Sequence, residues 1–291
     1  MAYRSVFRAD LFEGQVAVVT GGGSGIGRCI AHELSALGAH VVVAGRKEDK
    51  LIAVAAEIAA SGGSASYQVC NIRDEAQVAA LMQTTVERHG RLDHLVANAG
   101  GQFLAPPDAI SLKGWNAVIE TNLTGTFLCC KAAKSAWMGA HGGAIVAIVA
   151  DFWNGMPLMA HTSAARAGVS NLMQSLSLAW APLGIRCNAV APGTIASSGL
   201  KNYPPPVISM LSEFKTQIPA KRLGTESEVS AAVTYLLSPA AAYVTGETMK
   251  VDGGSSLYRQ MAPVPDHHRS VAFDAFHLAA DLPDLPGMSD T

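Results

Sequence analysis

The stretch that most constrains the fold of this chain is Thr20 to Gly27, with the sequence TGGGSGIG. It follows an apolar run, VAVV, that is typical of a buried strand, and it leads into residues whose apolar positions recur at helical spacing. A glycine turn between a strand and a helix gathers main-chain N–H groups at the positive end of the helix dipole. This arrangement is typical of dinucleotide-binding sites, with an ordinary glycine-rich turn as the alternative interpretation.

Each glycine of this stretch has a distinct expected task. Gly21 permits the tight turn, Gly25 lets the backbone approach a pyrophosphate, and Gly27 lets the helix pack closely on the strand. The spacing departs from the common G-x-G-x-x-G pattern. The loop residues predicted to contact a dinucleotide are Gly21, Gly23, Ser24, Gly25, Ile26 and Gly27.

Composition excludes several other classes of protein. The chain has 291 residues, 49% of them hydrophobic, which is enough for a sizeable core, and a net charge of -2 with no basic cluster, which argues against a nucleic-acid partner. No apolar run is long enough to span a membrane, and the N-terminus has no signal-peptide core. The five scattered cysteines indicate a reducing, cytosolic compartment, and the nine histidines show no metal-ligand spacing, so no metal is expected.

Strand and helix patterns alternate along the chain, which predicts an α/β fold. Strands are expected near 15–20, 40–45, 65–70, 93–97, 143–149, 185–191 and 247–251, and helices near 25–37, 48–61, 74–89, 114–139, 161–182 and 226–238. Near-continuous apolar strands predict an α/β fold with one parallel sheet of about seven strands and helices on both faces, over residues 1–258. Segment 194–220 is expected to be irregular, either a substrate lid or a plain surface loop, and 259–291 a tail or an inter-subunit arm.

The end of the second expected strand indicates which dinucleotide binds. A site for NAD usually carries a carboxylate there to hold the ribose 2′-hydroxyl, but this chain has Arg46 and Lys47. A cationic pair suits a 2′-phosphate, so we expect NADP(H); a basic helix start without a ligand is the alternative. Further contacts are expected where the third and fourth strands end, although Asn98 alternatively caps a turn. These residues are Asn71, Ile72, Asn98, Ala99 and Gly100.

In order and spacing, TGGGSGIG, NAG at 98–100, ETNLTGTF around Asn122 and APGT at 191–194 resemble the short-chain dehydrogenase/reductase family. The resemblance covers about residues 12–257 and implies a single-domain, Rossmann-type doubly wound fold, nicotinamide-cofactor chemistry and a homotetramer. The phrases HTSAARAGVSNL and PAKRLGTESEV are similar to the peroxisomal trans-2-enoyl-CoA reductase branch and to related citronellol/citronellal dehydrogenase-like sequences. By this resemblance, four residues after the sixth strand orient the nicotinamide amide: Pro192, Gly193, Thr194 and Ile195.

The chain departs from the family's usual set of Asn, Ser, Tyr and Lys. Only Asn122 matches; Arg166 stands at the Lys position, which implies a contact with the cofactor ribose, and Thr162 at the Tyr position. The Ser position falls on an apolar stretch. Threonine lacks an acidic proton, so it cannot replace tyrosine as an acid–base group, but its hydroxyl can donate a hydrogen bond to a substrate oxygen.

Two other residues offer a proton route. Asp151 follows the fifth strand, at the sheet edge where open α/β sheets place their active sites, and a Tyr stands near this position in related dienoyl-CoA reductases. His161 adjoins Thr162, and imidazole is the side chain that most often carries protons in active sites. The alternatives are that Asp151 caps a turn and that His161 is an ordinary residue at the start of a helix.

Losing the phenol impairs alcohol oxidation, which needs a base on the hydroxyl, more than enoyl reduction, which needs donors for a developing oxyanion. We therefore expect an NADP(H)-dependent enzyme that reduces a trans-2-enoyl-CoA. An alcohol/aldehyde dehydrogenase for a medium-chain or terpenoid alcohol such as citronellol is one alternative, and a catalytically silent NADP(H)-binding protein is another. The last four residues do not resemble a peroxisomal address, so a cytoplasmic location is expected.

Overall fold

Seven parallel strands form one sheet in the order β3-β2-β1-β4-β5-β6-β9. The computed structural model describes residues 2–258 and 263–283. The strands are β1 Val16–Thr20, β2 His40–Gly45, β3 Ser64–Val69, β4 His94–Ala97, β5 Gly143–Ile148, β6 Ile185–Pro192 and β9 Thr248–Val251. The order reverses between β1 and β4, which is the switch point where ligands bind in doubly wound folds. The expected fold class is confirmed.

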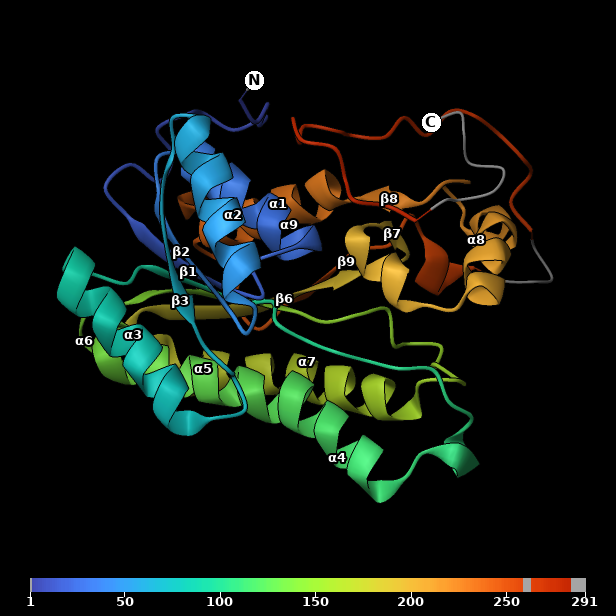
Figure 1. Ribbon diagram of the computed structural model, residues 1–291, viewed down its shortest axis with the longest axis horizontal. Coiled ribbons are helices and arrows are strands. Elements are labelled where there is room, and N and C mark those ends of the chain that lie inside the picture. Colours follow the sequence, from blue (N-terminus) through green and yellow to red (C-terminus); the bar gives the residue numbers. More distant parts are fainter. Residues whose placement is uncertain (1, 259–262, 284–291) are drawn as a thin grey trace.

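Helices cover both faces of this sheet (Figure 1). The helices α1, α2 and α9 lie on one face and α3 to α7 on the other, while α8 stands at one end of the molecule. Their bounds are α1 Gly25–Ala36, α2 Glu48–Ala60, α3 Glu75–His89, α4 Leu112–Ile119, α5 Gly125–Ala133, α6 Gly139–His141, α7 Ala160–Trp180, α8 Pro205–Gln217 and α9 Glu226–Leu237.

The central strand β1 shows why its sequence is apolar throughout. Val16 and Val18 pack in a buried cluster with residues of α3, α5 and α7, whereas Ala17 and Val19 pack in a second cluster with residues of α1, α2 and α9. Because successive side chains of a strand point to opposite faces, a sheet covered on both sides needs apolar residues at every position. The ends of β1 and β4 are therefore held in fixed positions for the site.

Segment 194–220 is not the irregular insertion that the sequence predicts. It holds a short strand, β7 Ile195–Ala196, a 3-10 turn, Ser198–Asn202, and the thirteen-residue helix α8. Two of the three consecutive prolines occupy the first turn of α8, where their fixed φ suits a helix and their missing N–H would have no partner. A second strand, β8 Gly224–Thr225, pairs with β7 and closes the base of the segment.

The helix expected over 114–139 contains two π-helical turns. The first, Glu120–Thr124, separates α4 from α5, and the second, Lys134–Met138, precedes α6. Asn122 lies in the first of these π turns. Single π turns frequently occur at functional sites, since the extra residue re-aims a side chain.

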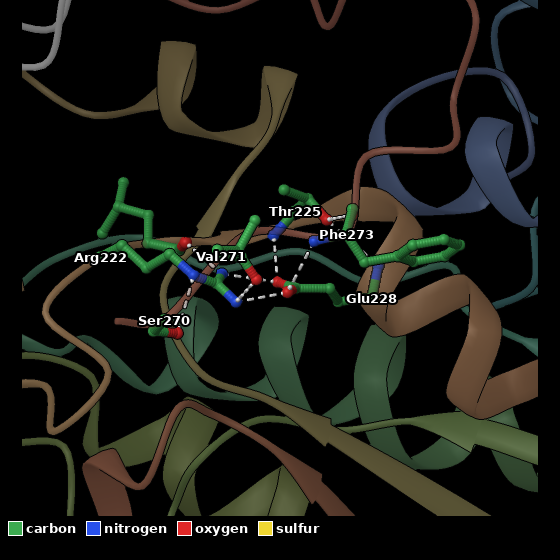
Figure 2. Close-up of polar contacts among 7 residues, drawn as sticks. Arg222, Thr225, Glu228, Ser270, Val271 and Phe273 are labelled. Carbon is green, nitrogen blue, oxygen red and sulfur yellow. Dashed lines mark hydrogen bonds and ion pairs between the residues drawn. The ribbon is translucent and has the colours of Figure 1, made fainter. Parts of the chain in front are cut away.

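Residues 263–283, which we name the C-terminal strap, pack on their own chain. Figure 2 shows Arg222 paired with Glu228, with Nη2 at 2.6 Å from Oε1, while its Nε donates to Ser270 Oγ of the strap. Thr225 Oγ1 donates to Phe273 O at 2.6 Å, and Phe273 N donates to Glu228 Oε1. An inter-subunit role for the strap stays a prediction, and residues 288–291 lie outside the described residues.

The strap covers the outer face of α1. Its residues Ala275 and Phe276 are buried in a small apolar cluster with Tyr3 and Cys29. The hydroxyl of Ser227 in α9 accepts hydrogen bonds from the N–H groups of Ala275 and Phe276, both at 3.1 Å. The two ends of the described chain therefore meet over the helix that begins at the glycine turn. No described helix is both long and apolar enough to cross a lipid bilayer.

Candidate active site

The glycine turn between β1 and α1 has the geometry that its sequence predicts. Gly21 has φ 66° and Gly25 has φ 57°, values that glycine adopts without strain. A Cβ on Gly27 would overlap Gly21 O and the Asn98 amide, so this position excludes any larger residue. The turn thus brings the start of α1 against the end of β4.

Asn98 holds this turn in place. Its Nδ2 donates to Thr20 O at 2.9 Å, and its own N–H donates to Thr20 Oγ1 at 3.0 Å. The alternative of a turn-capping residue therefore describes its side chain, while a cofactor contact at 98–100 stays a prediction. These hydrogen bonds tie the loop to the end of β1. The sheet therefore fixes the direction of the loop's remaining N–H groups.

The start of α1 fits the phosphates of a dinucleotide. The N-cap residue Ser24 makes no capping hydrogen bond with its side chain, and the first turn contains no acidic residue. Helix N-terminal N–H groups that lack a capping partner attract anions, and the dipole adds to this effect. Gly23, Ser24 and Ile26 are each half-buried or exposed, so this part of the loop is accessible.

Two cations follow β2 as expected. Arg46 and Lys47 are exposed, and Lys47 is the N-cap of α2. Neither forms an ion pair within 4.0 Å with any other residue that the structure describes. The pair is therefore available for an external anion. Beyond β3, Asn71 is half-buried and accepts the Arg73 N–H, and the buried Ile72 packs against Gly125.

Asn122 clamps the loop that follows β4. Its fully buried side chain donates from Nδ2 to Gly101 O at 2.7 Å and to Val118 O at 3.0 Å, and its Oδ1 accepts the Gly101 N–H at 3.1 Å. The sequence predicts a buried Asn at this place but not its two-way pairing with Gly101. The pairing holds Gly100 between the side chains of Asn122 and Arg166.

Arg166 is a buried cation that forms no ion pair with any carboxylate in the described part of the chain. Its side chain lies in α7, its Nη1 donates to Ile148 O at 2.7 Å, and its Nε has no hydrogen-bond partner. A Cβ on Gly100 would overlap Nη2, so the guanidinium lies directly against this glycine. Burial lowers the pKa of Arg166 to about 10, which leaves it charged at neutral pH. A buried charge and an orphaned donor at the switch point fit the hydroxyls of a bound ribose or a substrate oxygen.

Thr162 and His161 stand together on the first turn of α7. Both side chains are fully buried. The Thr162 N–H donates to His161 Nδ1 at 2.8 Å, and Thr162 Oγ1 lies 3.4 Å from the same nitrogen. Because Nδ1 accepts, the proton of the neutral ring lies on Nε2, which is buried without a partner and next to Phe103.

Asp151 lies beyond the end of β5, and its N–H donates to Pro192 O at 3.1 Å. Its Oδ1 is buried without a partner. Burial and the nearby Asp252 raise the pKa of Asp151, although Lys250 opposes this shift. A carboxyl group with a raised pKa at this edge is a candidate proton carrier.

Asp252 and Lys250 are functional candidates that the sequence analysis missed. Asp252 Oδ1 and Oδ2 accept the N–H groups of Gly254 and Ser256, both at 2.9 Å, and Lys250 Nζ lies 4.0 Å from the centre of the Trp153 ring. The available signal was the VDGG sequence, in which an Asp precedes two glycines directly after the last strand. Burial raises the pKa of Asp252, but its hydrogen bonds and the charge of Lys250 lower it more. The pKa of this carboxyl group is therefore lowered overall.

The residues after β6 also lie at this edge. Gly193 N donates to Val251 O at 2.9 Å, and Thr194 O accepts the Gly224 N–H at 3.0 Å. Pro192 ends β6, and the buried Ile195 begins β7. A contact between Gln102 and Tyr203 joins the loop after β4 to the segment before α8. Segment 194–220 therefore borders the candidate site, and its role as a substrate lid stays a prediction.

Comparisons with known proteins show the family to which this chain is related. A family described as Enoyl-(Acyl carrier protein) reductase matches residues 21–256. A peroxisomal 2,4-dienoyl-CoA reductase of Pongo abelii is 36% identical over 88% of each chain, and a probable 2,4-dienoyl-CoA reductase of Bacillus subtilis is 34% identical over 84% of this chain and 98% of its own. A citronellol catabolism dehydrogenase of Pseudomonas aeruginosa has a solved structure that is 47% identical, with a TM-score of 0.79, over 87% of this chain and 100% of its own.

Proposed function

This chain belongs to the short-chain dehydrogenase/reductase family of nicotinamide-dependent oxidoreductases, and from that premise we propose that it reduces a trans-2-enoyl-CoA with NADPH. The observation that carries the proposal is the buried guanidinium of Arg166, one helical turn after Thr162, where the family's usual phenol is absent. Hydride addition to the β-carbon of an enoyl thioester places negative charge on the thioester oxygen. A fixed cation and hydrogen-bond donors stabilise this charge without any phenol.

The residues divide the work as follows. The bound nicotinamide supplies hydride. Arg166 holds ribose hydroxyls and contributes positive charge, and Asn122 fixes Gly100 and Gly101 beside it. Asp151, with its raised pKa, delivers a proton toward the α-carbon, directly or through water. Thr162 donates a hydrogen bond to the substrate oxygen.

A substrate panel assayed in both redox directions tests the proposal. NADPH consumption with a trans-2-enoyl-CoA, and slower NADP⁺ reduction with any alcohol, is the expected result. Saturated acyl-CoA thioesters of equal length serve as the matched control, because they bind the same surfaces but have no double bond. Cofactor binding without turnover on either panel would instead support the catalytically silent alternative.

Alcohol oxidation is the second candidate function. It is favoured by the 47% identity to the protein named as a citronellol catabolism dehydrogenase. A cavity of about 450 Å³ lined by Phe152, Met156 and Pro157 offers an apolar surface for a prenyl or alkyl chain. In this reaction Asp151 would act in its ionised form as the base on the hydroxyl.

Preference for NADPH over NADH depends on Arg46 and Lys47 in the proposal. We expect the double variant Arg46→Ala/Lys47→Ala to weaken NADPH binding about 10- to 100-fold, because two charge-assisted contacts to a 2′-phosphate are lost. NADH affinity should change less than twofold. Fluorescence titration with both cofactors measures this, and Lys113→Ala, at an exposed position of α4, is the control. Tighter binding of NADH than NADPH by the unmodified protein would contradict the assignment.

The hydroxyl of Thr162 is tested by Thr162→Val, which keeps the shape of the side chain. We expect kcat to fall about tenfold, the value of one lost hydrogen bond, while the Kd for NADPH is unchanged. Stopped-flow turnover and cofactor titration measure the two quantities separately. Equal kcat values in the two proteins would remove Thr162 from the mechanism.

We also propose a homotetramer and a cytoplasmic location. Apolar side chains on the outer face of α4, α5 and α7 are exposed in a single chain, among them Leu112, Trp115, Phe127 and Leu178. Such a surface is suited to a partner subunit. All five cysteines are buried free thiols, which suits a reducing compartment. Light scattering at assay concentrations tests the assembly.

A further inference from the structure

A buried carboxyl group lies against the phosphate-binding turn. Glu226 is the first residue of α9, and its side chain is 5% exposed. A Cβ on Gly25 would lie 3.8 Å from Glu226 Oε1 and 3.3 Å from Ser198 Oγ. Gly25 is the glycine at which the backbone is expected to approach the pyrophosphate. The carboxyl group is therefore a wall of the cradle into which a dinucleotide would place its negative charges.

The surroundings of Glu226 do not neutralise it by an ion pair. Arg28, a cation that acts on Glu226, donates from Nε to Glu57 at 2.7 Å, and no described residue forms an ion pair with Glu226 within 4.0 Å. The Ser198 N–H donates a hydrogen bond to the carboxylate. The other titratable groups that act on it are Asp274 of the strap and Cys29 of α1.

Titration of this group falls in the physiological range. Burial raises the pKa of Glu226 from 4.5 to about 7; Arg28 and the Ser198 N–H oppose the shift, and Asp274 adds to it. In a protein without this group, or with it paired, the start of α1 would attract phosphates equally at all pH values near neutral. Here the same turn contains a group that is neutral below its pKa and negative above it.

We infer that Glu226 makes cofactor binding proton-coupled: the dinucleotide binds the form of the protein in which this carboxyl group is neutral, and binding takes up a proton. The inference rests on the proposed function only for the dinucleotide itself, not for the substrate. A pyrophosphate beside Gly25 repels the carboxylate, which raises the affinity of Glu226 for a proton. By linkage, raising the pH must then lower the affinity for the cofactor.

The sign of the effect follows from the two protonation states. Below the pKa of the free protein the group is neutral with or without cofactor, so affinity is independent of pH. Between the pKa values of the free and bound protein, affinity falls by about tenfold per pH unit. Above both values it is constant again, at its lowest level.

The test measures the Kd for NADPH and for NADH from pH 6 to pH 8.5 by fluorescence titration, in the full-length protein and in Glu226→Gln. Because the titration of the cofactor's own phosphate is common to both proteins, the ratio of their Kd values isolates Glu226. We expect the ratio to be within twofold at pH 6, and the variant to bind about tenfold more tightly than the unmodified protein at pH 8.5. Equal ratios at all pH values would overturn the inference.

A matched control exists on the neighbouring helix. Glu33 of α1 is also fully buried with a raised pKa, but the hydroxyls of Tyr3, Ser5 and Ser230 surround it, on the side of α1 that faces the strap and α9. Glu33→Gln should alter the pH dependence of stability while keeping the pH dependence of cofactor binding. If it changed cofactor binding as Glu226→Gln does, the effect would be a general one of the buried acids and not of the phosphate cradle.

Calorimetry of the unmodified protein needs no variant. Titration with NADPH near pH 7.5 in two buffers of different ionisation enthalpy should show net proton uptake, and Glu226→Gln should show less. Release of protons, or identical heats in the two buffers for both proteins, would contradict the inference. Absence of any dinucleotide binding by the unmodified protein would instead contradict the proposed function, so the two failures are distinguishable.

Discussion

Replacing Arg166 by methionine is expected to lower kcat/KM for enoyl-CoA reduction by about 10²- to 10³-fold while leaving the fold as stable as before or more stable. The loss of activity follows from removing a fixed positive charge at the place where negative charge develops. The gain or conservation of stability follows from the guanidinium's burial without a carboxylate: its Nε has no partner and its pKa is lowered by desolvation. Replacing a buried charge by an apolar side chain of similar volume is neutral or stabilising by roughly 1–4 kcal/mol.

Steady-state kinetics and thermal unfolding of the same preparation measure the two effects. The control is Arg166→Lys, which keeps the charge but loses the forked donors that reach Ile148 O, and it should retain intermediate activity. An Arg166→Met protein that unfolds at lower temperature, or that retains a tenth or more of kcat/KM, would show that the guanidinium is a structural group.

Replacing Asp151 by asparagine is expected to lower kcat by about 10²- to 10³-fold, the usual contribution of a positioned acid or base. The substitution keeps the shape of the side chain and removes its titration. Because burial and Asp252 raise its pKa, the unmodified group is protonated to a higher pH than an ordinary aspartate. If it gives a proton to the substrate, kcat falls as the pH rises through this pKa, and the Asn variant shows no such fall.

The direction of this pH dependence distinguishes the two proposed reactions. In alcohol oxidation the ionised form of Asp151 is the active one, so the rate would rise with pH through the same range. Asp108→Asn, at an exposed carboxylate of the 3-10 turn before α4, should leave both the rate and its pH profile unchanged. A pH profile shared by Asp151→Asn and the unmodified enzyme would assign the proton transfer to another group.

Much of this fold could be predicted from the sequence because its signals are local. The seven strands are short apolar runs. The glycine turn requires positive φ at Gly21 and Gly25, and glycine is the residue type that adopts such values without strain. Asn122 was found because the ETNLTGTF segment around it resembles the family's motif. Its pairing with Gly101 was not, because that contact joins segments far apart in the chain.

The features that escaped prediction depend on tertiary contacts or on residues with two meanings. Consecutive prolines before α8 indicate an irregular segment, yet proline is equally suited to the first turn of a helix. The strap has no helix or strand periodicity in its sequence, since its hydrogen-bond partners lie in other segments of the chain. Glu226 reads as an ordinary acid at a helix start, and only the fold reveals that Gly25 lies beside it.

The strap has a consequence for how freely its own sequence can vary. Arg222, Thr225 of β8 and Ser227 of α9 bind main-chain groups of Val271, Phe273 and Ala275, whereas Ala275 and Phe276 also bury their side chains against α1. Substitutions at positions held only through the main chain should be tolerated, unlike those at Ala275 and Phe276, whereas cutting the chain before the strap would uncover the helix start that carries Glu226. Proteolytic trimming or a fused tag that displaces this segment would then act at the start of α1, as a change in how tightly nucleotide is retained.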